Sequence, residues 1–145
     1  MTRGSVVAFA GVFIAGVAVG QLSPRSSAAA QAPDANRVFE LRTYTAPEGK
    51  LEELHARFRT QTMRIFRKHN MTSVAYFRPQ DDPLKSNTLI YILAHPSRQE
   101  AEKNWAAFQA DPEWQKVNTE SQVNGRIVTK VERIFLDPAD YSPLK

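Results

Sequence analysis

The chain has 145 residues, a formal net charge of +4 and no cysteine. The length suits one domain, and the missing cysteines exclude disulfides, thiolate nucleophiles and cysteine-based metal sites. Residues 1–32 contain two arginines and no acidic residue, so the rest of the chain carries 17 basic and 15 acidic side chains, a net charge of +2. A charge this small gives no electrostatic argument for a nucleic-acid partner.

The first 32 residues have the layout of a secretory signal peptide. A basic start precedes an uncharged stretch, Val6–Gly20, and small or polar residues follow up to Ala30-Gln31-Ala32, a form that signal peptidase accepts. We predict cleavage after Ala32, a periplasmic or secreted product, and no stable membrane insertion after cleavage. Two alternatives stay open. An uncleaved membrane anchor would need about twenty apolar residues, and a mitochondrial transit peptide would be richer in arginine.

The folded domain is predicted to span residues 38–136, after a flexible lead-in at residues 33–37. Apolar and polar side chains alternate over residues 38–45, which indicates a strand. Residues 51–69 carry an apolar stripe at helical spacing, which predicts a helix. Asn70 follows, and a residue that tolerates left-handed dihedrals is suited to end that helix.

Two further strands are predicted at residues 71–78 and 88–94, with a polar loop between them. The second of these is apolar on both faces, whereas a strand covered on one side only would alternate. We therefore expect the sheet to be covered on the face turned away from the helices as well.

The C-terminal half is predicted to add two helices and a last strand. Ser97 and Glu100 have the spacing of a capping box at the start of one helix. Asp111-Pro112 marks a new N-cap followed by proline at the first position of a short extra helix. The last strand is predicted at residues 127–136, and residues 137–145 form a C-terminal tail.

The predicted order, βαββαβ, is that of a ferredoxin-like plait, an α+β fold with two helices on one face of an antiparallel sheet. The expected strand order is 4-1-3-2. Burying several hundred Å² of apolar surface on the other face would contribute about 10 kcal/mol before association costs. We therefore expect a homodimer in which two such sheets pack face to face.

Several short motifs resemble the NIPSNAP family. They are the run Glu40-Leu41-Arg42-Thr43-Tyr44, then Pro47 and Gly49-Lys50, His69 at the end of the long helix, and Asp111-Pro112 with Trp114. The resemblance covers about residues 38–135. It implies a dimeric α/β barrel, related in architecture to antibiotic-biosynthesis monooxygenases and stress-responsive barrel proteins. One departure is Asn70, where the family often has glycine.

The resemblance implies no settled activity. Better-known members of the family resemble interaction and trafficking proteins, and eukaryotic relatives are mostly linked to mitochondria, whereas this leader looks bacterial and secretory. Whether the chain is an enzyme stays open. The sequence contains no nucleophile elbow, phosphate loop or dinucleotide fingerprint, and we expect neither a cofactor nor a metal.

Polar side chains of the first strand form the candidate ligand site. Glu40, Arg42 and Tyr44 are expected on the sheet face opposite the helices, in the space between two subunits, with Tyr91 joining them. An arginine beside a glutamate and two phenols can orient a small anionic or phenolic ligand. The alternative is a structural ion pair between Glu40 and Arg42. His95, at a strand end near the barrel mouth, is the candidate proton carrier, beside a purely structural role.

These observations favour a non-catalytic barrel that binds a small hydrophobic or aromatic ligand, or a protein partner. The alternative is a cofactor-independent monooxygenase or isomerase that acts on an aromatic or polyketide-like molecule in the barrel cavity. A third class is a structural interaction protein with a filled barrel. The first two classes need a real cavity, and the third does not.

Overall fold

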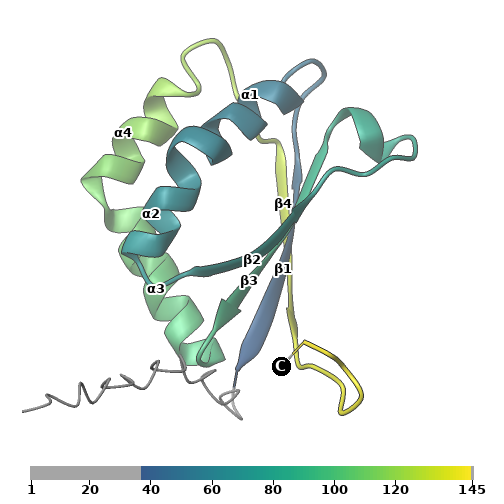
Figure 1. Ribbon diagram of the computed structural model, residues 1–145. Coiled ribbons are helices and arrows are strands. Elements are labelled where there is room, and N and C mark those ends of the chain that lie inside the picture. The colour runs from purple at the N-terminus through teal and green to yellow at the C-terminus, as the bar shows by residue number, and fades with distance from the viewer. Residues whose placement is uncertain (1–36, 145) are drawn as a thin grey trace, which may run out of the picture. The chain divides into compact units, whose positions relative to one another are not determined.

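The computed structural model describes residues 37–144. The predicted signal peptide, residues 1–32, lies outside the described residues, as does the lead-in except for Arg37. Figure 1 shows a single sheet with the helices α1 to α4 on one side of it. The sheet is antiparallel with the order β2-β3-β1-β4, which confirms the predicted order and the ferredoxin-like α+β fold. Within residues 37–144, no helix combines the length and hydropathy needed to span a bilayer.

The strands lie close to their predicted positions. They are β1 (Val38–Thr45), β2 (Thr72–Phe77), β3 (Thr88–His95) and β4 (Lys130–Leu136). β4 begins at Lys130 rather than at residue 127, and Ile127 instead packs into the core with no exposed surface. Pairing with both neighbours places Arg42 of β1 directly between Tyr91 of β3 and Arg133 of β4.

The predicted helix at residues 51–69 contains a π-helical turn. α1 (Leu51–Arg57) is joined to α2 (Met63–Lys68) through this turn, η1 (Phe58–Thr62). The hydroxyl of Thr62 donates to the carbonyl of Arg57, five residues earlier, at 3.3 Å. Single π turns inside α-helices are frequent at functional sites. Asn70 has a φ of 56°, so the helix ends in a left-handed residue, as predicted.

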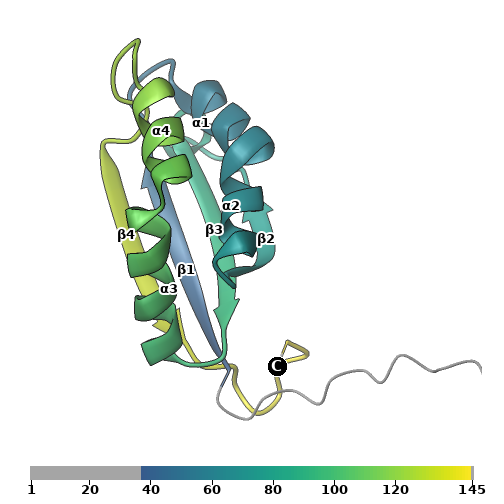
Figure 2. The ribbon, with the colours of Figure 1, turned by 90° about the vertical axis from the view of Figure 1, so that its left-hand side faces the viewer.

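Both predicted helix caps in the C-terminal half are confirmed. Ser97 Oγ accepts the backbone N–H of Glu100 at 3.1 Å and starts α3 (Arg98–Ala110). Asp111 Oδ1 accepts the backbone N–H of Glu113 at 2.9 Å and starts α4 (Pro112–Glu120). A short 3₁₀ helix, η2 (Leu84–Ser86), lies in the loop between β2 and β3. Figure 2 shows α3 and α4 over the β4–β1 side of the sheet and α1 and α2 over the β3–β2 side.

The core lies between the sheet and the helices. Its centre is Tyr91, which has no exposed surface and is surrounded by four aromatic rings at centroid distances of 5.2 to 6.0 Å. The rings belong to Tyr44, Phe58, Phe66 and Tyr76. Edge-on and offset contacts of this kind stabilise a core beyond the area that they bury.

The opposite side of the sheet, the open sheet face, is apolar, and no helix within residues 37–144 covers it (Figure 1). Ile134, Leu41 and Ile92 lie in one cross-strand row, and Ile90 and Phe77 are paired in the next. Ile134 is 57% exposed and Phe77 is 47% exposed. The apolar character predicted for the second face of β3 therefore extends through Leu41 to Ile134 in one row, while the next row also contains Thr43 and Glu132.

Candidate functional site

The predicted site residues come together, but on the other face of the sheet. Glu40, Arg42 and Tyr44 point towards the helices, so their expected position between two subunits is wrong. Glu40 has no exposed surface and Arg42 retains 8%. The two charges neutralise each other, which lets them face the core, while the apolar residues that alternate with them line the open sheet face.

Glu40 is the centre of a buried hydrogen-bond network. Its Oε1 accepts Arg42 Nη1 at 2.7 Å, and its Oε2 accepts Trp105 Nε1 at 2.6 Å and His95 Nε2 at 3.0 Å. Because an ionised carboxylate only accepts, His95 donates through Nε2 here. Burial alone would raise the pKa of Glu40, but the bonds from His95 and Trp105 and the charge of Arg42 outweigh it and lower that pKa. The structural ion pair considered as an alternative is therefore present.

Trp105 is the member of this network that sequence reasoning missed. Its position in a helical apolar stripe predicts a core residue, and it is buried, but its indole N–H also fixes Glu40 and its ring stacks on Arg42. The guanidinium carbon of Arg42 lies 4.0 Å from the centroid of the Trp105 ring, a close cation–π contact. The Arg42 Nε–H has no hydrogen-bond partner within residues 37–144.

Arg42 and Trp105 also line a hollow between α3 and β4, which we call the α3–β4 groove. Its volume is about 400 Å³, within the range of small-molecule sites. The other residues that line it are Ala106, Gln109, Val131 and the pair Glu102 and Arg133. Arg133 donates twice to Glu102, at 3.0 and 3.3 Å. Both arginines of the groove therefore have a carboxylate partner, and its charge is balanced.

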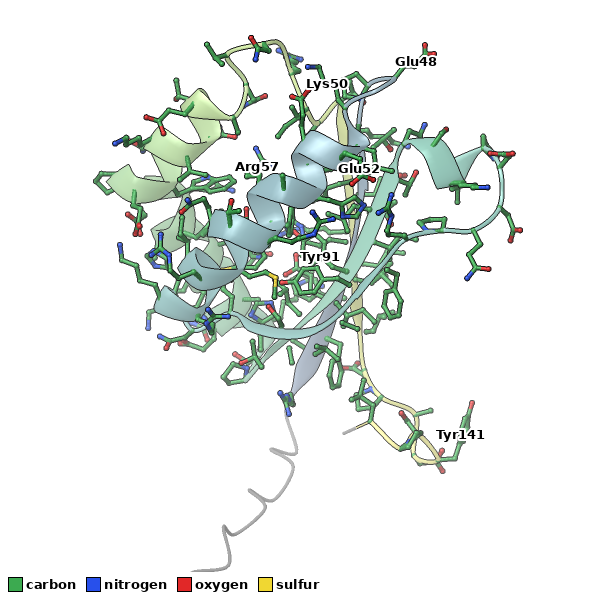
Figure 3. The ribbon with its side chains drawn as sticks, turned by 45° about the horizontal axis from the view of Figure 1, so that its top comes forward. Glu48, Lys50, Glu52, Arg57, Tyr91 and Tyr141 are labelled. Carbon is green, nitrogen blue, oxygen red and sulfur yellow. The ribbon has the colours of Figure 1, made fainter. Side chains whose placement is uncertain are left out.

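The other two candidates are enclosed. His95 and Tyr91 are 1% and 0% exposed, and neither lines the α3–β4 groove. His95 is therefore buried against Glu40 rather than placed at an open mouth. Burial raises the pKa of Tyr91 well above its ordinary value, so its hydroxyl stays neutral. Figure 3 shows Tyr91 in the layer between the helices and the sheet.

Asp111, from the Asp111-Pro112 motif, joins the end of α2 to the start of α4. Asp111 Oδ2 contacts His69 Nε2 at 2.6 Å and Lys68 Nζ at 2.7 Å, at the end of α2, while its Oδ1 caps α4. The bonds from Lys68 and His69 hold the pKa of Asp111 well below its ordinary value of 3.8. His69 and Lys68, at the end of α2, are thus tied directly to the residue that caps α4.

Comparison with known proteins agrees with the motifs. A profile of the NIPSNAP family matches residues 39–143. The chain belongs to the NIPSNAP family. The matched range contains the Glu40 network, the Asp111 junction and all four strands but for the first residue of β1. A comparison with curated proteins found no match.

Solved structures of other NIPSNAP proteins share the fold. A NIPSNAP family protein from Agrobacterium tumefaciens has a TM-score of 0.67 and 23% identity, over 76% of this chain and 100% of that one. An uncharacterized NIPSNAP-like domain protein from Burkholderia xenovorans has a TM-score of 0.65 and 20% identity, over 74% and 90% of the two chains.

A more distant similarity links this NIPSNAP domain to an enzyme. SnoaB, a cofactor-independent oxygenase from Streptomyces nogalater, has a TM-score of 0.50 and 14% identity, over 75% of this chain and 99% of that one. At this identity the similarity is one of fold, and function has to be argued from the site.

Proposed function

We propose that this NIPSNAP protein is an exported homodimer that binds a small aromatic molecule in the α3–β4 groove. The observation that carries the binding role is Arg42. Its guanidinium is held in place by Glu40 and stacked on Trp105, yet its Nε–H has no partner within residues 37–144. A buried donor without an acceptor is costly, and an acceptor oxygen on a ligand would remove that cost.

The groove favours a neutral, planar ligand. Because Arg42 and Arg133 are already paired with carboxylates, an additional anion would gain little there. The buried indole of Trp105, which borders the groove, and the aliphatic Val131 supply apolar contact, and Gln109 supplies an amide. A phenol or quinone-like ring with one acceptor oxygen matches these groups in size and polarity.

A cofactor-independent oxygenase or isomerase is the second candidate, and the fold shared with SnoaB favours it. The side chains around Glu40 argue against it. Three donors already occupy the Glu40 carboxylate, and the His95 and Tyr91 side chains have almost no exposed surface, so a ligand in the groove would meet no free base. We therefore place binding ahead of catalysis.

The open sheet face supports the homodimer. One apolar row, made by Ile134, Leu41, Ile92 and Ala75, crosses all four strands, and monomeric proteins rarely expose apolar patches of several hundred Å². A second copy of the same sheet is the occupant that matches its apolar character. Export is proposed from the leader at residues 1–32 alone.

The binding role can be tested with 1-naphthol, a neutral planar probe that carries one hydroxyl. The chain has two tryptophans, so its two indole N–H signals in a ¹H–¹⁵N spectrum are separate reporters, assigned with Trp114→Phe. We expect 1-naphthol to shift the Trp105 signal and leave the Trp114 signal in place.

Two exposed alanines on α3 give a matched pair of variants. Ala106 lines the groove and Ala107 does not. We expect Ala106→Leu to fill the groove and weaken 1-naphthol binding by about tenfold or more, about 1.4 kcal/mol, while Ala107→Leu binds like the unmodified protein. Equal binding by both variants, or no shift of the Trp105 signal, would refute the proposed site.

A further inference from the structure

Arg57, the last residue of α1, is a buried cation that has no countercharge among the residues that the structure describes. Its side chain is on the flank of α1 that faces α4 (Figure 3), and the residue is only 7% exposed. Its Nη1 donates to Asn118 Oδ1 at 3.1 Å and to Ser121 Oγ at 3.3 Å, and its guanidinium lies 5.1 Å from the Trp114 ring centroid. All three of these partners are neutral.

Arg42, the other buried arginine within residues 37–144, shows what is missing. Arg42 is as deeply buried as Arg57, but Arg42 has Glu40 at 2.7 Å. Arg57 has no ion pair within residues 37–144, and its Nε–H is buried there without a hydrogen-bond partner. An unpaired charge is expensive to bury, so an anion that is absent from the protein itself is the expected partner.

Arg57 lies on the wall of a second hollow, the α1–α4 groove, between α1 with η1 on one side and α4 on the other. Its volume is about 390 Å³, and it shares no lining residue with the α3–β4 groove. Ala56 and Val117 give it apolar walls, and Thr60 and Gln61 of the π-helical turn add polar groups. The π turn begins directly after Arg57, so the irregular part of the helix borders this groove.

The remaining lining residues restrict the charge of the ligand. Glu53 and Glu120 also line the groove, and each has its own lysine, Lys50 at 2.7 Å and Lys116 at 3.8 Å. One unpaired cation between two paired glutamates can neutralise one negative charge, and the glutamates disfavour a second.

We propose that the α1–α4 groove binds a small monocarboxylate, with the carboxylate on Arg57 and a short apolar body between Ala56 and Val117. Arginine binds carboxylates well because its planar guanidinium matches their geometry. The site is separate from the α3–β4 groove. Its ligand carries a single negative charge, whereas the ligand proposed for the α3–β4 groove is neutral.

The test uses sodium butyrate on the full-length protein, with 1-butanol as the uncharged analogue and inorganic phosphate, at a pH well above its second pKa, as the dianion. Trp114 stacks beside Arg57, so its indole N–H signal is the reporter. We expect butyrate to shift this signal with saturation and to raise the melting temperature, and 1-butanol to do neither. Phosphate should bind at least about tenfold more weakly than butyrate.

Asn118→Asp is the decisive variant, since it places a carboxylate of the same shape at 3.1 Å from Arg57 Nη1. We expect this internal carboxylate to raise the melting temperature without ligand and to weaken butyrate binding at least about tenfold. Asn124→Asp adds the same charge at an exposed position outside the groove and should change neither.

Arg57→Lys gives an independent check that keeps the charge but loses the planar fork, and it should weaken butyrate binding. If butyrate fails to shift the Trp114 signal, or if Asn118→Asp binds butyrate as well as Asn124→Asp does, the proposal is wrong. These outcomes do not depend on 1-naphthol or on Trp105, so failure of either site is recognised separately.

Discussion

The Glu40 carboxylate accepts hydrogen bonds from Arg42, His95 and Trp105. Because Glu40 has no exposed surface, water cannot take the place of these donors. Removing the charge with Glu40→Gln would leave the guanidinium of Arg42 buried without its countercharge. We expect this change to lower the free energy of unfolding by about 3–5 kcal/mol, measured by urea denaturation at pH 7. Glu102→Gln is the matched control, because the pair between Glu102 and Arg133 is half exposed, and it should cost less than about 1 kcal/mol.

Glu40 should also make the free energy of unfolding depend on pH in the acid range. The pKa of Glu40 is lower in the folded chain than its ordinary value of 4.5, so its ionised form contributes fully above that value and the contribution is lost as the pH falls through the folded pKa. The difference between the unmodified protein and Glu40→Gln should therefore shrink below about pH 4. A difference that stays constant from pH 7 to pH 3 would contradict the ionised network.

Between elements, Asp111 connects the end of α2 to the start of α4. Asn caps a helix about as well as Asp, so Asp111→Asn keeps the cap of α4. The same change removes the negative charge that faces Lys68 and His69. Because the folded pKa of Asp111 is depressed, we expect the variant to be less stable at pH 7 and to approach the unmodified protein as the pH falls below about 4. Thermal unfolding at several pH values measures this, and Asp81→Asn, in an exposed loop, should have no such effect.

The helices and strands were predictable from local signals, whereas the orientation of the site was not. The caps at Ser97 and Asp111 and the left-handed Asn70 depend on neighbouring residues, and they are confirmed. Strand alternation separates Glu40 from Leu41 but does not say which set faces the helices. In this sheet both faces are apolar enough to be covered, so the choice depends on Trp105, which is distant in sequence and donates to Glu40.

Arg57 was missed for a related reason. It lies three residues after Leu54 and next to Phe58, within the buried side of α1, but a basic residue in the last turn of a helix is ordinarily assigned to solvent. Its position beside the apolar stripe was the available signal. The π turn that follows Arg57 does not change the helical spacing of apolar residues in the sequence. The α1–α4 groove and the α3–β4 groove could therefore only be found in the folded chain.

For the whole molecule, the proposed homodimer rests on the open sheet face. Ile134 lies on the edge strand β4, next to Leu41 of β1, and is 57% exposed, so a charge there would be buried by a second copy packed on this face. We expect Ile134→Glu to convert the homodimer into a folded monomer in sedimentation velocity. Val123→Glu, at a position that is 80% exposed in a loop, should remain a dimer. A monomeric unmodified protein would rule out the barrel assembly.

Native mass spectrometry of the untagged protein is the most direct test of the proposed homodimer with a small aromatic ligand in the α3–β4 groove. After non-denaturing purification and incubation with 1-naphthol, we predict dimers of chains that begin at Pro33, with up to one 1-naphthol per chain. Ala107→Leu dimers should carry the same added mass, and Ala106→Leu dimers should lack it. Bare monomers, or 1-naphthol retained equally by both variants, would contradict the account.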